Sequence, residues 1–174
     1  ERIIALKHFF TVDPSYFESL AMARTEKGVG SEGVTFLHVS HMNLIKGIPY
    51  LLDAWRKFKQ VGDREQCRLV LAGRRDENLD EVIRRDYSDL PGLELAGFVP
   101  DLLECLGDAD VFVSPSVSDN GPGTIAEAMA AGMPVVSSLN CGFASLISDG
   151  ENGFTYDFSD IDRLAEILGW FAEN

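Results

Sequence analysis

The sequence predicts a doubly wound α/β domain, in which a Rossmann-like parallel sheet carries helices on both faces. Short apolar runs alternate with segments of helical periodicity along the whole chain. The run VTFLHVS at 34–40 is apolar enough to be a central strand. No internal repeat or low-complexity tract interrupts the alternation. With 174 residues, the chain is long enough for one domain with a substantial core.

The strands are predicted where apolar runs end at glycine, proline or charged residues. The expected strands are 34–40, 67–73, 93–97, 110–113, 133–137 and, at one edge of the sheet, 154–156. The helices are predicted from start signals, such as Asp13-Pro14, and from apolar stripes, such as Leu51 to Phe58. The expected helices run from Pro14 to about Lys27, over 48–60, 77–87, 101–107, from Pro122, and over 144–148 and 159–172. Residues 1–13 are expected to be an arm between domains, and residues 14–174 the domain itself.

Charge and composition exclude several classes of function. The net charge of −13 argues against a nucleic-acid groove and against binding an anionic membrane surface. A phosphate ligand must then be held by local donors. The three cysteines are far apart and lack zinc spacing, so we expect reduced thiols in a reducing, cytoplasmic compartment. No signal peptide or run long enough to span a bilayer is seen, and the start at Glu1 suggests a piece of a longer protein.

The stretch 113–136 is the most informative part of the sequence. It reads as a buried strand, a polar glycine-rich loop, an apolar helix and a second buried strand. If Pro122 takes the first helical position, the backbone N–H groups of Gly123, Thr124 and Ile125 are unpaired donors at the positive end of the helix. This predicts an anion site suited to phosphate.

Glu127 is the only charged residue between Pro122 and Met133. It shares a helix face with Gly123, and helix side chains lean toward the N-terminus, so its carboxylate is expected to reach the helix mouth. A second interpretation is that Thr124 and Glu127 form a capping box. The two interpretations do not exclude each other.

Unusual residues follow the predicted strands, at the edge of a parallel sheet where ligands bind. These loops are Ser40 to Lys46, Gly73 to Arg75, Phe98-Val99, Asp119 to Gly123 and Asn140 to Gly142. All five are expected to converge on one crevice.

The chemistry in these loops suits a ligand with both phosphate and hydroxyl groups. Lys46 could supply a charge to a diphosphate, although Lys-Gly before a helix is also common in plain loops. His41 could add a donor or be solvated, and Arg74 with Arg75 could reach phosphate or cap the next helix. Asp119 and Glu127 could both accept hydrogen bonds from hydroxyls. A nucleotide sugar fits this combination, while no metal cluster and no Walker-type loop stands out.

Taken together, the motifs resemble those of a known family. They are FLHVSHMNLIKG, LLDAWRKF, LVLAG, GFVPDLLECLGDADVFVSPS, DNGPGTIAEAMAAGMPVVSS and LISDGENGF. From about Val12 to its end, the chain resembles the C-terminal, donor-binding domain of a GT-B-fold retaining glycosyltransferase of family 4, one half of a two-domain enzyme.

The resemblance implies a role for individual residues. Glu127 would bind the ribose hydroxyls, Asp119, where the family usually has Glu, would face the donor sugar, and Lys46 would neutralise the diphosphate. Val99, after Phe98, would offer backbone contacts to the base. The residues expected to line the nucleotide-sugar site are Ser40, His41, Gly73, Arg74, Phe98, Val99, Asn120, Gly121, Gly123, Thr124 and Ile125. The family often has Arg at the position of His41, so Arg74 could take over part of its role.

The resemblance also implies an activity. The full-length protein would transfer a hexosyl group, with retention and without cofactor or essential metal, to a glycan, lipid or small-molecule acceptor in cell-envelope polysaccharide synthesis. An N-terminal domain would bring the acceptor, and any membrane association, so this chain alone would bind donor without turnover. The alternatives are a non-catalytic assembly domain and a nucleotide-sugar epimerase or phosphorylase of the same architecture.

Overall fold

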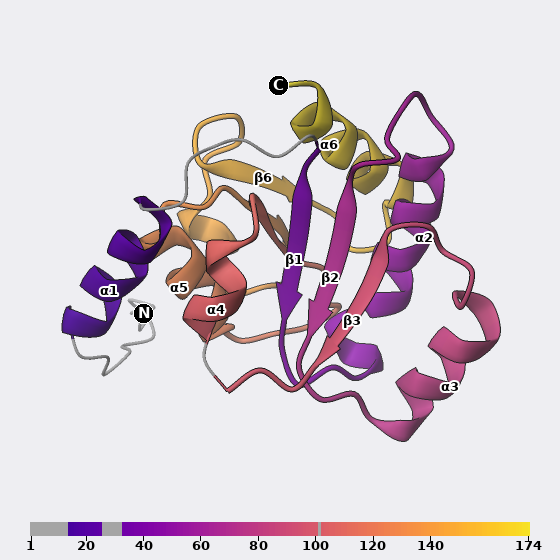
Figure 1. Ribbon diagram of the computed structural model, residues 1–174, viewed down its shortest axis with the longest axis horizontal. Helices are drawn as coiled ribbons and strands as arrows, with labels where there is room; N and C mark the ends of the chain where they lie inside the picture. Colours follow the sequence, from indigo (N-terminus) through magenta and orange to yellow (C-terminus); the bar gives the residue numbers. More distant parts are fainter. Residues whose placement is uncertain (1–13, 26–32, 101) are drawn as a thin grey trace, which may run out of the picture.

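A computed structural model describes residues 14–25, 33–100 and 102–174 of the chain (Figure 1). The expected arm at 1–13 lies outside the described residues. The described part contains a six-stranded sheet in the order β3-β2-β1-β4-β5-β6, and each neighbouring pair of strands is parallel. The strands are β1 Thr35–Val39, β2 Arg68–Ala72, β3 Leu93–Gly97, β4 Val111–Ser114, β5 Val135–Ser138 and β6 Gly153–Tyr156.

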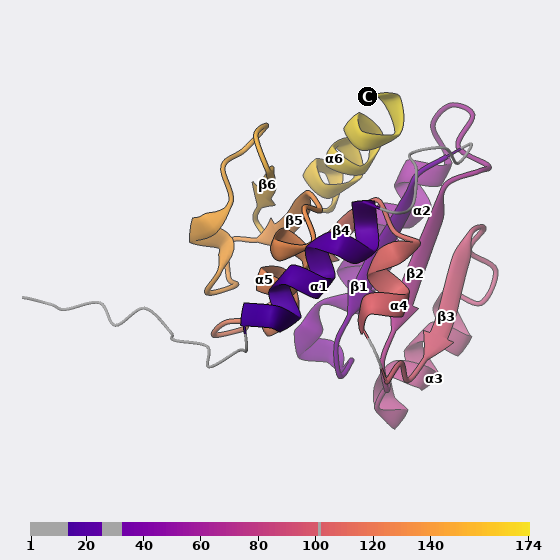
Figure 2. The ribbon, with the colours of Figure 1, turned by 60° about the vertical axis from the view of Figure 1, so that its left-hand side comes forward.

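Helices cover both faces of this sheet, which confirms the predicted doubly wound fold (Figures 1 and 2). One core cluster joins one face of the sheet to α2 Ile48–Lys59, α3 Glu77–Asp86 and α6 Ile161–Glu173. The other cluster joins the opposite face to α1 Pro14–Thr25, α4 Leu102–Gly107 and α5 Gly123–Ala130.

The alternation of side chains along each strand separates the two cores. In β1, Phe36 packs with Trp55 and Phe58 of α2, with ring centroids 5.8 Å from each. Its neighbour Leu37 belongs to the opposite cluster, because successive side chains of a strand point to opposite faces. A central strand that is apolar on both faces is what the sequence of β1 predicted.

Three local predictions need correction. The predicted loop after β1 contains a short 3-10 helix, η1 Leu44–Lys46, because the Asn43 side chain accepts a hydrogen bond from the Lys46 N–H at 3.2 Å. The brief helix expected at 144–148 is also a 3-10 turn, η2 Ala144–Leu146. Pro122 is the N-cap of α5 rather than its first helical residue.

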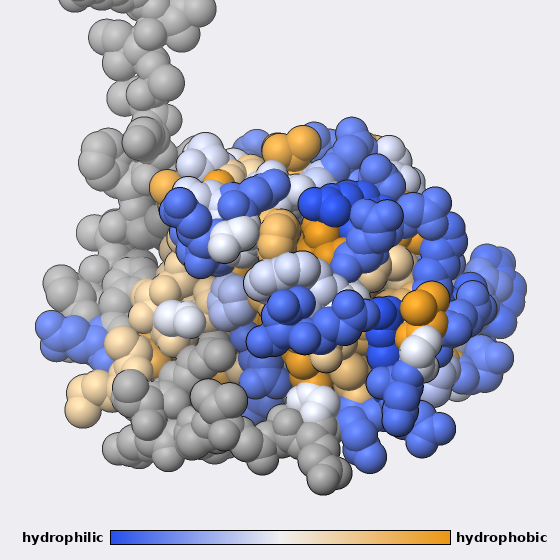
Figure 3. Space-filling model, turned by 90° about the horizontal axis from the view of Figure 1, so that it is seen from above, coloured by the Kyte–Doolittle hydropathy of each residue, from blue (hydrophilic) through white to orange (hydrophobic). Residues whose placement is uncertain are grey.

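The carboxyl ends and the amino ends of the strands carry different kinds of residue. In Figure 1, β1, β2 and β3 point toward the lower edge of the picture, and predicted site residues follow each of these strands in the sequence. Figure 3 looks onto the opposite edge, where hydrophilic side chains interleave with small apolar areas. The candidate site therefore lies at the carboxyl ends of the strands, where doubly wound sheets bind their ligands.

Candidate functional site

The order of the strands reverses direction between β1 and β4. The chain passes from β1 to β2 and β3 on one side, and then returns to place β4 on the other side of β1. Loops that leave two neighbouring strands in opposite directions open a crevice at their carboxyl ends, where doubly wound domains bind ligands. The loop after β1 carries Lys46, and the loop after β4 carries Asp119.

Lys46 and Asp119 form an ion pair across this crevice. The Lys46 Nζ lies 2.5 Å from Asp119 Oδ2, and the two side chains are 26% and 13% exposed. Gly47 makes the approach of the two loops possible, since its φ is +70° and a Cβ there would lie 1.9 Å from the Pro115 carbonyl oxygen. The Val117 N–H donates to the Ile45 carbonyl at 2.9 Å and ties η1 to the chain after β4.

The backbone around Asp119 is fixed by the loop after β5. The Asp119 N–H donates to the Asn140 carbonyl at 3.2 Å, and the Gly142 N–H donates to the Asp119 carbonyl at 2.8 Å. The Gly121 N–H donates to Asp119 Oδ1 at 3.3 Å. One carboxylate oxygen of Asp119 thus accepts a hydrogen bond from its own loop, and the other contacts Lys46. The predicted loops Asp119 to Gly123 and Asn140 to Gly142 meet here.

Glu127 lies on α5 and is half-buried. Burial raises the pKa of its carboxyl group, and the hydrogen bond donated by the Tyr16 hydroxyl at 3.3 Å lowers it in part. The predicted capping box is absent, because α5 begins at Gly123 with no side-chain cap, which places Thr124 inside the first turn. The carboxylate of Glu127 is instead held by α1.

One of the three backbone N–H groups predicted to be unpaired at the start of α5 has a partner. The Ile125 N–H is paired, since it donates to the Pro122 carbonyl at 3.0 Å. The prediction of three unpaired donors at this helix end is therefore wrong for Ile125.

A second group of predicted residues surrounds a pocket of about 350 Å³ at the carboxyl ends of β1, β2 and β3. The pocket is lined by Val39, Ser40, His41, Gly73, Arg74, Phe98 and Val99. The Arg74 guanidinium lies 4.8 Å from the centroid of the Phe98 ring, which is 62% exposed. At Gly73, where φ is +124°, a Cβ would lie 1.8 Å from the Ser40 carbonyl oxygen, so glycine is required for the loops after β1 and β2 to meet. Lys46, Asp119 and Glu127 do not line this pocket. The structure pairs Lys46 with Asp119 and Glu127 with Tyr16, so the predicted single crevice does not form one pocket.

His38 is not among the predicted site residues, yet it contacts both β4 and Ser40, which lines the pocket. This buried side chain lies in β1, with Nδ1 2.8 Å from the Val113 carbonyl oxygen of β4 and Nε2 2.8 Å from the Ser40 Oγ. Burial lowers the pKa of His38 to about 4. Its signal in the sequence is a polar residue inside an otherwise apolar central strand.

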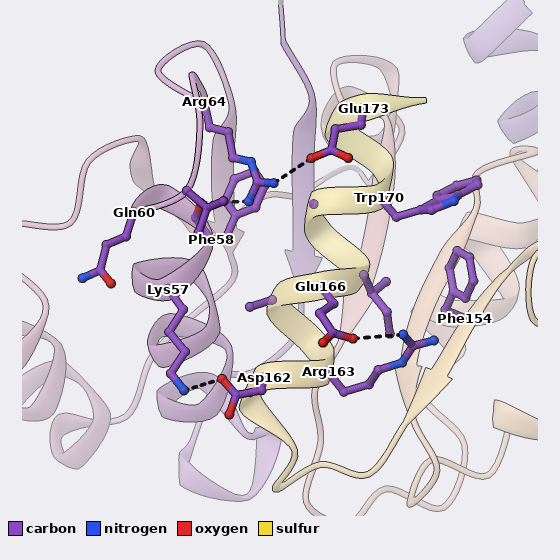
Figure 4. A pocket seen from close by; sticks show the side chains of 14 residues that line it. Lys57, Phe58, Gln60, Arg64, Phe154, Asp162, Arg163, Glu166, Trp170 and Glu173 are labelled. Carbon is purple, nitrogen blue, oxygen red and sulfur yellow. Dashed lines mark hydrogen bonds and ion pairs between the residues drawn. The ribbon is translucent and has the colours of Figure 1, made fainter.

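A larger pocket, about 880 Å³, lies elsewhere and contains none of the predicted residues. It is formed along α2 and α6, where the ion pairs Lys57–Asp162, Arg64–Glu173 and Arg163–Glu166 lie (Figure 4). Its charged side chains already have partners of opposite charge. Size alone therefore does not identify the candidate site, which is defined by its place at the strand ends.

Within residues 14–25, 33–100 and 102–174, no group of three His, Cys, Asp or Glu side chains is arranged to hold a metal ion. The helices of the same residues include none with the length and apolar character needed to cross a membrane.

Comparison with known proteins identifies the family. Residues 33–174 match the family described as glycosyl transferases group 1. The chain belongs to this family.

Two relatives are identical to the chain at about a third of the aligned residues. The phosphatidyl-myo-inositol mannosyltransferase of Mycolicibacterium smegmatis is 33% identical over 155 residues, which are 86% of this chain and 39% of that protein. The amylovoran biosynthesis glycosyltransferase AmsK of Erwinia amylovora is 31% identical over 141 residues, 76% of this chain and 34% of AmsK. The chain thus spans well under half the length of these relatives.

Solved structures share the fold. WaaG, a glycosyltransferase involved in lipopolysaccharide biosynthesis, superposes with a TM-score of 0.72 at 20% identity, over 90% of this chain and 42% of WaaG. HepE of Anabaena, solved in complex with UDP-glucose, gives a TM-score of 0.73 at 22% identity, over 91% of this chain and 45% of HepE. These similarities confirm that the sheet and its helices have the architecture of GT-B glycosyltransferases.

Proposed function

We propose that this chain is the domain of a retaining glycosyltransferase that binds the nucleotide-sugar donor. The observation that carries the proposal is the Lys46–Asp119 pair at the point where the strand order reverses, together with a pocket at the carboxyl ends of β1, β2 and β3. A volume of about 350 Å³ falls within the range of small-molecule sites. The relatives support the same class of donor, since HepE was solved with UDP-glucose.

Each part of the donor has a counterpart in the site. The diphosphate would lie at Lys46 and the first turn of α5, where positive charge is available. The base would occupy the pocket beside Phe98 and Val99, and the ribose hydroxyls would donate to Glu127. Asp119 would accept from the sugar hydroxyls once the diphosphate has drawn Lys46 away from it.

The reaction would be driven by electrostatics. As the bond between the anomeric carbon and the diphosphate oxygen breaks, negative charge builds up on the diphosphate, and Lys46 would stabilise it. Arg74, which lines the pocket, would add positive charge near the diphosphate. We propose that no metal takes part, that a separate N-terminal domain brings a glycan, lipid or small-molecule acceptor, and that the enzyme works in the cytoplasm on cell-envelope polysaccharides.

Calorimetry of this chain with UDP, UDP-glucose, GDP-mannose and ADP-glucose tests the proposal. At least one should bind, and Glu127→Ala should abolish that binding. Glu166→Ala is the matched control, because Glu166 is an exposed glutamate on α6 whose partner is Arg163. Unchanged affinity in Glu127→Ala, or no binding of any donor to the wild type, would contradict the assignment. Assays of the full-length protein distinguish a transferase from a non-catalytic assembly domain. A transferase should turn over only when both its N-terminal domain and Lys46 are present, whereas an assembly domain should show no turnover.

A further inference from the structure

The hydrogen bonds around His38 define the direction of each proton. A carbonyl oxygen can only accept, so the contact of 2.8 Å with Val113 requires that Nδ1 carries the ring proton. In the neutral ring, Nε2 is then an acceptor, and the Ser40 hydroxyl must donate to it at 2.8 Å. The ring also stacks on Phe112, with centroids 6.4 Å apart, which fixes its plane.

The backbone of Ser40 is held in place, and its hydroxyl cannot reverse this bond because Nε2 carries no proton to donate. Its N–H donates to the Ala72 carbonyl at 3.2 Å, and its own carbonyl lies against Gly73, where no Cβ would fit. The hydroxyl proton is directed at His38, yet Ser40 lines the pocket between the ends of β1 and β2. The Ser40 oxygen can therefore offer only its lone pairs to a ligand.

We propose that His38 is a positioning residue that holds the Ser40 hydroxyl as a hydrogen-bond acceptor toward the pocket. The ligand group at Ser40 is then an N–H or O–H donor of a nucleoside, and not a phosphate oxygen, which is itself only an acceptor. This inference rests on the proposed function, because it assigns one part of the nucleotide to one wall of the pocket. Lys46 and Asp119 lie near enough to act on His38 electrostatically, so the diphosphate is expected on their side of it.

Titrations with UDP and uridine, followed by NMR, test the inference. Ser40→Ala should weaken the binding of UDP and of uridine by the same factor, about fivefold for one neutral hydrogen bond. A loss seen with UDP but not with uridine would place a phosphate at Ser40 and overturn the inference, as would unchanged binding of both. If the wild type binds none of UDP, UDP-glucose, GDP-mannose and ADP-glucose, the proposed function itself fails and takes this inference with it. If it binds only a guanosine or adenosine donor, the same titrations are made with GDP and guanosine, or with ADP and adenosine, and the same outcomes decide.

The role of His38 is tested by its own variants. His38→Leu should weaken both ligands about as much as Ser40→Ala, and the double variant should be no weaker than either. His38→Gln, whose amide oxygen can accept from Ser40, should recover most of the affinity. Additive losses, or equal losses in the Leu and Gln variants, would show that His38 does not act through Ser40.

A direct measurement on the wild type does not depend on how the variants fold. The ¹⁵N shifts of His38 at pH 7 should show a protonated Nδ1 and an unprotonated Nε2. A proton on Nε2 would make Ser40 the acceptor of that bond and free its own proton for the ligand, which would overturn the inference.

Discussion

The Nζ of Lys46 and the Oδ2 of Asp119 lie 2.5 Å apart and join the two loops that flank the reversal of strand order. Each group is the natural partner of a different part of a nucleotide sugar, the lysine for phosphate and the carboxylate for hydroxyls. In the ligand-free chain they neutralise each other. A diphosphate that binds Lys46 would release Asp119 for the sugar.

Lys46 should therefore discriminate between ligands with and without phosphate. We expect Lys46→Ala to weaken UDP binding by about 10- to 100-fold, the range for a hydrogen bond between charged groups, and to leave uridine binding unchanged. Calorimetry with both ligands measures this. Lys57→Ala is a matched control, because Lys57 forms a similar ion pair with Asp162 away from the site. Equal losses for UDP and uridine would rule out a contact with phosphate.

Gly47 should be irreplaceable for the approach of the two loops. Gly47→Ala adds a Cβ against the Pro115 carbonyl at a positive φ, and we expect a cost of about 3 kcal/mol in the free energy of unfolding, together with loss of UDP binding. Gly62 has the same φ of +70° and no atom within 4 Å of the added Cβ, so Gly62→Ala should cost only about 1 kcal/mol. Urea unfolding of both variants compares them. Similar costs would show that the contact with Pro115 is unimportant.

His38 should make stability depend on pH. Its folded-state pKa of about 4 lies below the ordinary value of 6.5, so between these values the unfolded chain binds a proton that the folded chain does not. The free energy of unfolding should fall as the pH drops through this window, by about 3 kcal/mol in total, and no further below pH 4. Urea unfolding of the wild type and His38→Gln from pH 7 to pH 4 measures the difference. Parallel curves would contradict a neutral, buried His38.

Glu127 should make stability depend on pH in the direction opposite to His38. Burial raises the pKa of its carboxyl group, so the folded chain holds the proton at a pH where the unfolded chain has lost it. Stability should therefore decrease as the pH rises from 4.5 through the raised pKa. At pH 7 Glu127→Gln should melt at a higher temperature than the wild type, and the gain should shrink below pH 4.5. Glu166→Gln, on the exposed face of α6, should show no such gain, and a gain of equal size there would count against this explanation.

The sequence predicts the layers of this fold better than the arrangement of its site. Alternating apolar runs and helical stripes are local, so the parallel sheet and the helices on both faces follow from them. The order of the strands depends on contacts between distant segments, and only that order places Lys46 beside Asp119, 73 residues later in the chain. His38 could not be recognised for the same reason, since its partner Val113 lies 75 residues away.

The start of α5 shows a limit of local pattern as well. Thr124 and Glu127 have the spacing of a capping box, but a box forms only if Thr124 is the cap. The cap is Pro122, so the helix begins at Gly123, two residues earlier than a cap at Thr124 would place it, and the Tyr16 hydroxyl of α1 donates to the carboxylate. A tertiary contact thus replaced the local one.

The structure of this chain in complex with UDP-glucose tests the central claim most directly. We predict that the diphosphate lies within hydrogen-bonding distance of Lys46 Nζ, that the ribose contacts Glu127, and that the base fills the pocket beside Ser40 and Phe98. Asp119 should then contact the glucose rather than Lys46. A ligand bound in the larger pocket along α2 and α6 would contradict the account. So would a bound donor that lies away from Lys46 and Asp119 and leaves their ion pair intact.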